Sequence, residues 1–131
     1  MKPPPADPAR VRRVAVRLTN WVGDAVMNTP FLAMARRVFP QAQIAVIGRR
    51  NVLALFENHP DVDHAWVIDD RSLAGYRAAV ARLRAWRSDV GFALPNSVNS
   101  AALLALGGAR CRVGYARDGR AWLLTHPVKL R

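Results

Sequence analysis

Acidic side chains are scarce in this sequence of 131 residues: eight aspartates and one glutamate stand against 20 lysines and arginines, for a formal net charge of +11. This scarcity limits acid–base chemistry to a few carboxylates, each of which can be considered separately. Eighteen of the basic residues are arginines. Such a composition is typical of a solvated surface encoded by a GC-rich genome. It is equally typical of a protein with an anionic partner, such as nucleic acid, an acidic membrane surface or a phosphorylated glycolipid.

Cysteine, histidine and long apolar runs are also sparse. Cys111 is the only cysteine, which excludes an internal disulfide and is compatible with a reducing compartment. No apolar run approaches the ~18 residues of a transmembrane helix. No metal site is expected, because the three histidines are isolated in the sequence: His59, His64 and His126.

The amino-terminal residues 1–10 are rich in proline and are expected to form a flexible, polyproline-like tail. No apolar segment follows Lys2, so the start of the chain is not expected to be a secretory signal. The remaining residues, 11–131, have the size of one domain and enough apolar side chains for a core.

Strand and helix patterns alternate along this domain. Short apolar runs predict strands at 14–18, 44–47, 65–68, 90–94 and 112–115, with a sixth near 128–130. Alternating strands and helices indicate a Rossmann-like α/β fold, a parallel sheet with helices on both faces. The usual strand order, 3-2-1-4-5, places the first and fourth strands side by side.

Apolar spacing and capping residues predict the helices. The first helix is expected to bury Phe31, Met34, Ala35 and Val38. Asn51 is expected to cap a short helix over 52–57, and Ser72 a longer one. The longer helix is expected to bury Leu73, Tyr76, Val80, Leu83 and Trp86. A helix of small residues, 97–106, is expected to end at Gly107 and Gly108.

The loop after the first strand, Thr19 to Asp24, carries an amide, an aromatic ring and a carboxylate. In open α/β sheets, ligands bind at the carboxyl ends of the strands, so this loop and the one at 95–97 are expected to face each other across a crevice. Asp24 is the carboxylate nearest to this crevice. It could act in catalysis there, or it could cap the next helix. Trp21 could stack on a sugar or pack under the loop, and Gly23 permits either a tight turn or close approach of a ligand. Of the other acids, Asp7 lies in the tail, four lie at the opposite edge (Glu57, Asp61, Asp63 and Asp89), and three share the carboxyl edge with Asp24: Asp69, Asp70 and Asp118.

Three short motifs carry a resemblance to a known family. They are the segment from Asn20 to Asp24 with Thr29-Pro30 behind it, the segment from Ala93 to Ser97 followed by Ser100-Ala101, and Arg112 to Tyr115 leading into 120–124. Together they resemble the ADP-heptose:lipopolysaccharide heptosyltransferases. These enzymes have two domains of the GT-B type, and the resemblance from Arg13 onward covers the N-terminal, acceptor-side domain only.

The resemblance implies specific roles. Asp24 matches the proposed general base, which deprotonates the acceptor hydroxyl. Contacts with the acceptor are expected for the polar and aromatic loop residues Asn20, Trp21, Gly23, Asn96 and Ser97, although Ser97, and less so Asn96, could instead cap a helix. Arg117 and Arg120 follow the fifth strand and could either face an acceptor phosphate or lie in a solvated loop. The acceptor would be the lipopolysaccharide inner core, reached at the cytoplasmic face of the inner membrane by peripheral contact with its anionic surface. ADP-heptose would bind mainly to a C-terminal domain that these residues do not include, so transfer by this chain alone is not expected, and no cofactor or metal is implied.

Two alternatives belong to other classes. A dinucleotide-binding domain is disfavoured for NAD, because the first loop has a single glycine and Gly48 is followed by Arg49 and Arg50 rather than by an acid. NADP stays open, since arginine can bind a 2′-phosphate. A basic nucleic-acid-binding module without transferase activity lacks a helix-turn-helix or aromatic RNA-binding signature, so no nucleic acid is expected as a partner. Competition between duplex DNA and phosphorylated glycolipid would separate the nucleic-acid-binding alternative from a glycolipid-binding domain.

Overall fold

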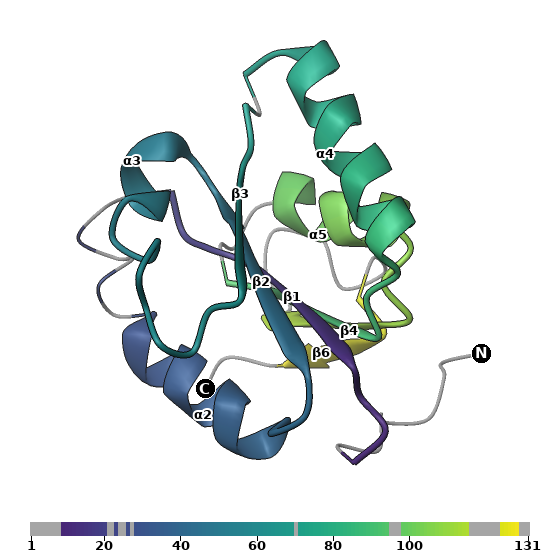
Figure 1. The fold of residues 1–131 in the computed structure, drawn as a ribbon. Helices are drawn as coiled ribbons and strands as arrows, with labels where there is room; N and C mark the ends of the chain where they lie inside the picture. Colours follow the sequence, from purple (N-terminus) through teal and green to yellow (C-terminus); the bar gives the residue numbers. More distant parts are fainter. Residues whose placement is uncertain are drawn as a thin grey trace.

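The computed structural model of the chain describes residues 9–20, 23, 26, 28–69, 71–94, 98–115 and 124–128. Its strands are β1 (Arg13–Arg17), β2 (Gln43–Gly48), β3 (His64–Val67), β4 (Val90–Ala93), β5 (Cys111–Tyr115) and β6 (His126–Val128). Its helices, labelled as in Figure 1, are α2 (Thr29–Val38), α3 (Arg50–Leu53), α4 (Leu73–Trp86) and α5 (Val98–Leu106). The strands form one sheet in the order β3-β2-β1-β4-β5-β6, with parallel pairing throughout. The predicted order is confirmed, and β6 extends the sheet beyond β5.

Helices cover both faces of this sheet, with α2 and α3 on one side and α4 and α5 on the other (Figure 1). Successive side chains of β1 point to opposite faces. Val14 and Val16 pack into the core under α2 and α3, whereas Ala15 packs under α4 and α5. All three are fully buried. The fold is therefore the predicted Rossmann-like α/β sheet with an apolar core on each face.

Helix α2 buries a different stripe from the predicted one. Leu32 and Ala35 are buried, whereas Met34 is 51% exposed and Val38 is 42% exposed. The helix carries apolar residues in neighbouring pairs, such as Met34 beside Ala35, so two adjacent stripes satisfy the same spacing. Phe31, at the margin, is partly buried and meets Phe92 of β4 edge-on, with the ring centroids 5.0 Å apart.

The predicted N-cap residue is confirmed for α4 and is wrong for α3. Ser72 caps α4 as predicted, because its hydroxyl oxygen accepts a hydrogen bond from the backbone nitrogen of Gly75 at 3.0 Å. Asn51 does not cap α3: the helix begins at Arg50, and Arg49 occupies the N-cap position without a side-chain cap. The chain turns into α3 directly after Gly48, which leaves Asn51 inside the helix.

Two further details of α4 and α5 concern their ends. Leu73, predicted to be buried, is 72% exposed because it is the first residue of α4. Helix α5 ends as predicted, with Gly108 in the left-handed region at φ 80°. Arg84 of α4 supports this end by donating from Nε to the carbonyl oxygen of Leu106 at 2.7 Å.

Among the described residues, no helix combines the length and the apolar character that a membrane span requires.

Two aspartates hold the amino edge of the sheet. Asp89 Oδ2 accepts hydrogen bonds from the backbone nitrogens of Arg12 and Arg13, at 2.9 and 3.1 Å. Asp63 Oδ2 accepts from Arg36 Nη2 at 2.7 Å and from the backbone nitrogen of Ile44 at 2.8 Å. The two carboxylates therefore bind the backbone at the starts of β1 and β2. This structural role is expected for acids outside the candidate site.

These contacts also change the ionisation of Asp63. Desolvation by burial raises its pKa, but the hydrogen bond from Ile44, together with the hydrogen bond and charge of Arg36, outweighs that effect. The pKa of Asp63 therefore lies below its usual value. A lowered folded-state pKa stabilises the fold above the unfolded-state pKa of about 4, and this contribution is lost as the pH falls through the folded-state value.

We expect Asp63→Asn to reduce the stability of the chain at pH 7 by no more than about 1 kcal/mol, because the side chain of Asp63 is 42% exposed and solvent screens its ion pair. The loss of stability on acidification below about pH 4 should be shallower in the variant than in the wild type. Urea unfolding at pH 7, 5 and 3 measures both quantities, with the exposed Glu57→Gln as control. Equal pH slopes for wild type and Asp63→Asn would contradict the assignment.

Candidate functional site

The last residue of β1 is a buried arginine. Arg17 is 3% exposed and pairs in the sheet with Ile47 of β2 on one side and Ala93 of β4 on the other. Its Nη1 donates to the carbonyl oxygen of Leu18 at 2.7 Å, and its Nη2 donates to Oδ1 of Asn20 at 2.8 Å. A buried guanidinium group needs such partners, because an unsatisfied buried charge is strongly destabilising. Arg17 therefore ties the end of the central strand to the first residues of the following loop.

A second contact holds the same segment. Asn28, which is 9% exposed, accepts hydrogen bonds at Oδ1 from the backbone nitrogen of Thr19 at 3.3 Å and from its hydroxyl at 3.1 Å. Asn28 occupies the N-cap position of α2 but makes no side-chain cap there. Its side chain is directed to Thr19 instead, while its backbone oxygen accepts from Leu32 at 3.1 Å. Arg17 and Asn28 thus hold the β1 exit segment, residues 18–20, at two points.

Of the eight predicted site residues, the structure describes Asn20 and Gly23. Asn20 is half-buried and bonded to Arg17. Gly23 lies in exposed helical backbone without a positive φ, and a Cβ placed on it would meet no heavy atom within 4 Å. The space above Gly23 is therefore open to close approach of a ligand. The other six residues lie outside the described part of the chain: Trp21, Asp24, Asn96, Ser97, Arg117 and Arg120.

The predicted meeting of the first and fourth strands is confirmed at their carboxyl ends. The backbone nitrogen of Leu94, directly before residues 95–97, donates to the carbonyl oxygen of Arg17 at 3.1 Å. On the other side of β1, the nitrogen of Leu18 donates to the carbonyl oxygen of Ile47 at 2.8 Å. Arg49 and Arg50 follow β2 at the same edge, at the start of α3. The central carboxyl edge therefore collects donors and positive charge, which suit the oxygen atoms of a hydroxylated or anionic ligand.

Among the described residues at this edge, the acid Asp69 has a structural role. Asp69, which follows β3, accepts hydrogen bonds from the backbone nitrogen of Arg71 at 3.3 Å and from the hydroxyl of Ser72 at 3.4 Å. A side chain at Gly75 would collide with the carbonyl oxygen of Asp69, so α4 begins tightly against this turn. Within the described ranges, no group of three or more histidine, cysteine or acidic side chains could hold a metal ion.

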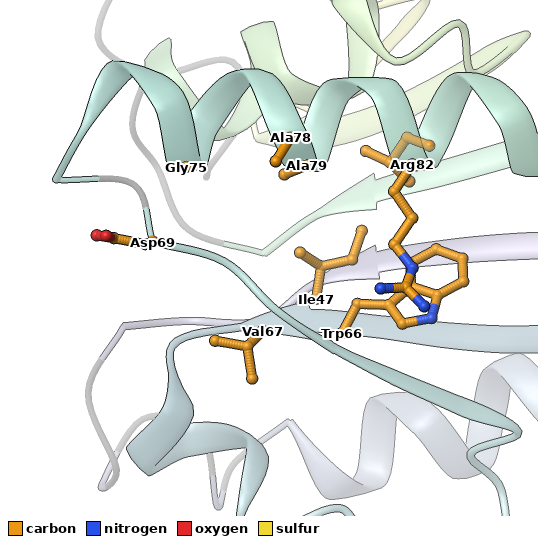
Figure 2. Close-up of a pocket in the computed structure, with 9 residues that line it drawn as sticks. Ile47, Trp66, Val67, Asp69, Gly75, Ala78, Ala79 and Arg82 are labelled. Carbon is orange, nitrogen blue, oxygen red and sulfur yellow. The ribbon is translucent and has the colours of Figure 1, made fainter.

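A hollow of about 220 Å³ lies between β3 and α4 (Figure 2). The guanidinium carbon of Arg82 lies 5.0 Å from the ring centroid of Trp66, in cation–π geometry. The ring of Trp86 meets Trp66 edge-on, with the centroids 5.1 Å apart. Two lining side chains, Arg82 and Trp66, therefore contact each other, and the hollow lies beside the edge strand β3 rather than between β1 and β4.

Sequence reasoning missed Arg17 and Asn28. The signal for Arg17 was present, because a single charged residue interrupts the apolar run from Val14 to Leu18. A buried strand tolerates a charged side chain only when other groups of the protein form hydrogen bonds with it. Asn28 gave no comparable signal, because an asparagine before a helix is ordinarily interpreted as a cap.

Comparison with solved structures gives three informative matches. The structure of Escherichia coli ADP-heptose lipopolysaccharide heptosyltransferase II matches over 91% of this chain and 35% of its own, with 28% identity and a TM-score of 0.81. A glycosyl transferase family 9 protein from Veillonella parvula matches over 92% of this chain and 36% of its own, with 21% identity and a TM-score of 0.79. Escherichia coli heptosyltransferase WaaC with ADP matches over 91% of this chain and 41% of its own, with 20% identity and a TM-score of 0.77.

These matches define the structural class of the chain, which is a Rossmann-like domain of the kind found in GT-B glycosyltransferases. The resemblance to the heptosyltransferases is confirmed at the level of structure, and the chain spans between about a third and two-fifths of the length of the matched proteins. No family model and no curated protein sequence matches the chain.

We expect Asn28→Ala to destabilise the chain by about 1–3 kcal/mol, because the backbone nitrogen of Thr19 and its hydroxyl lose their acceptor in a partly buried setting. Asn28→Asp keeps that acceptor and should cost less. Asn51→Ala, on the exposed side of α3, is the matched control and should change stability by less than about 0.5 kcal/mol. Chemical denaturation measures all three, and an equal loss in Asn28→Ala and Asn51→Ala would contradict the role of Asn28.

Proposed function

We propose that this chain is the acceptor-side domain of a glycosyltransferase that transfers heptose from ADP-heptose to the lipopolysaccharide inner core. The observation that carries the proposal is the match of 91% of the chain to a heptosyltransferase II structure at a TM-score of 0.81, with the Asn20–Asp24 motif leaving the central strand at its carboxyl end. Ligands of open α/β sheets bind at this edge, next to the point where the strand order reverses.

In this proposal, Asp24 is the general base, which takes the proton of the attacking acceptor hydroxyl as that oxygen bonds to the anomeric carbon and ADP departs. The acceptor is held by the side chains and backbone of the three motifs: Asn20, Trp21, Gly23, Asn96, Ser97, Arg117 and Arg120. ADP-heptose binds mainly to a second domain, so the chain by itself has little transferase activity. No cofactor is required.

The proposed place of action is the cytoplasmic face of the inner membrane, in peripheral contact with its anionic surface. The net charge of +11 supports this location, because a basic surface is attracted to both the acidic leaflet and a phosphorylated inner core. Arg49 and Arg50, at the carboxyl edge, add positive charge beside the proposed acceptor position.

Asp24→Asn, introduced into the full-length two-domain protein, should lower kcat about 100- to 10,000-fold with a smaller change in KM, because the amide cannot accept a proton. Heptose transfer from ADP-heptose to an inner-core acceptor measures the effect. Asp61→Asn, near the amino edge, is the matched control. A near-normal kcat with a lower melting temperature would identify Asp24 as a helix cap, and no transfer by the unmodified full-length protein would overturn the proposed function.

Replacing Arg117 and Arg120 together by alanine should raise the KM for the acceptor about tenfold and leave the KM for ADP-heptose nearly unchanged, since arginine binds phosphate through charge-assisted hydrogen bonds. Added salt should weaken acceptor binding by the unmodified protein in the same way. Arg87→Ala, an exposed residue after α4, is the control. An unchanged acceptor KM would assign Arg117 and Arg120 to a solvated loop, and competition by duplex DNA would favour the nucleic-acid alternative.

A further inference from the structure

The contact between Arg17 and Asn20 determines which end of the Asn20 amide faces the surroundings. Arginine has only hydrogen-bond donors, so the group within 2.8 Å of its Nη2 must be the oxygen of the amide rather than the nitrogen. The orientation of Asn20 is therefore assigned by chemistry. Its amino group, Nδ2, lies on the other side of Cγ and is turned away from Arg17.

The guanidinium group is itself held in place. A different terminal nitrogen of Arg17 donates to the carbonyl oxygen of Leu18 at 2.7 Å, so two bonds define the plane of the group. Arg17 is 3% exposed, and the sheet pairs it on both sides with neighbouring strands. Asn20 is thus fixed by a buried, planar and permanently charged group rather than by a mobile surface side chain.

The two N–H donors of Asn20 Nδ2 have no acceptor among the described residues. No buried side-chain nitrogen or oxygen of those residues lacks a partner, so this Nδ2 is accessible to solvent rather than enclosed. Asn20 is half-buried and directly follows the central strand at the carboxyl edge. An oriented donor at this position can bind an oxygen atom of a ligand without first losing the freedom to rotate.

We propose that Arg17 is a positioning residue, which presents the Nδ2 donor of Asn20 to a hydroxyl or phosphate oxygen of the acceptor sugar. This inference rests on the proposed function, since it names the acceptor as the ligand of this edge. It adds a role for Arg17, a residue that the motif resemblance does not include, and it specifies which atom of Asn20 makes the contact.

Asn20→Asp separates the two roles of this side chain. The aspartate has almost the same shape and still accepts from Arg17, now through a charge-assisted bond, but it has no donor for the ligand. The melting temperature of the chain should therefore stay the same or rise. Asn20→Ala and Arg17→Met should both lower it, and the double variant should be no less stable than Arg17→Met alone, because the two residues share one bond. Asn58→Asp, an exposed asparagine in the turn before β3, is the matched control.

Binding is measured by calorimetry with a heptose-containing inner-core oligosaccharide, freed of its acyl chains, and the 131-residue chain. The wild type and Asn58→Asp should bind it equally. Asn20→Asp should bind at least about tenfold more weakly, because a donor is replaced by a carboxylate facing oxygen atoms. Arg17→Lys should keep part of the affinity that Arg17→Met loses. If Arg17→Met does not fold, Asn20→Asp and Arg17→Lys still decide the question.

A second titration uses the same oligosaccharide after phosphatase treatment. A loss of affinity in Asn20→Asp that persists after phosphatase treatment assigns the bond to a sugar hydroxyl, and a loss that disappears assigns it to a phosphate. Both results support the inference.

Wild-type affinity in Asn20→Asp would overturn the inference while leaving the proposed function intact. A melting temperature of Asn20→Asp as low as that of Asn20→Ala would overturn the positioning role of Arg17. No binding by the wild-type chain would overturn the proposed acceptor-side function, and the inference with it.

Discussion

The central strand β1 is enclosed on every side, and the remaining structure depends on that enclosure. It pairs with β2 along one edge and with β4 along the other, while helices cover both faces of the sheet (Figure 1). Residues 14–18 therefore have almost no contact with water. A strand in this position can include a charged side chain only with internal partners, and Arg17 obtains them from Leu18 and Asn20. Burial of the strand and the placement of residues 18–20 directly after it are thus two consequences of one constraint.

Different side chains lie at the two ends of the central strands. At the amino edge, carboxylates of Asp63 and Asp89 accept hydrogen bonds from backbone nitrogens at the starts of β1 and β2. At the carboxyl edge, the described side chains near β1 are donors and cations, among them Arg17 and Arg49. Asp69, a described acid at the carboxyl edge, is engaged by the turn before α4. The donors beside β1 suit the oxygen atoms of an anionic or hydroxyl-rich ligand.

The sequence patterns predict the sheet better than they predict the helix surfaces. Apolar strands that alternate with helices predict a parallel sheet with few possible strand orders. The contact between β1 and β4 follows from the usual order of such a sheet. The buried face of α2 does not follow, because Met34 and Ala35 are neighbouring apolar residues and packing against Phe92 and the sheet selects between two stripes. The motif residues identify the loop after β1, but the hydrogen bonds of Arg17 and Asn28 depend on three-dimensional distances that spacing does not encode.

The hollow beside Trp66 shows why concavity alone is a poor guide in this fold. Arg82 lies over the ring of Trp66, and Asp69 accepts from the turn before α4 (Figure 2). A ligand bound there would compete with the cation–π contact of Arg82 and with the hydrogen bonds of Asp69. At the β1 exit, by contrast, Asn20 keeps two N–H donors for which the described chain provides no acceptor, in a geometry set by a buried charge. Binding at that point would add hydrogen bonds without breaking any described one, which is consistent with the proposed acceptor position at the strand exit.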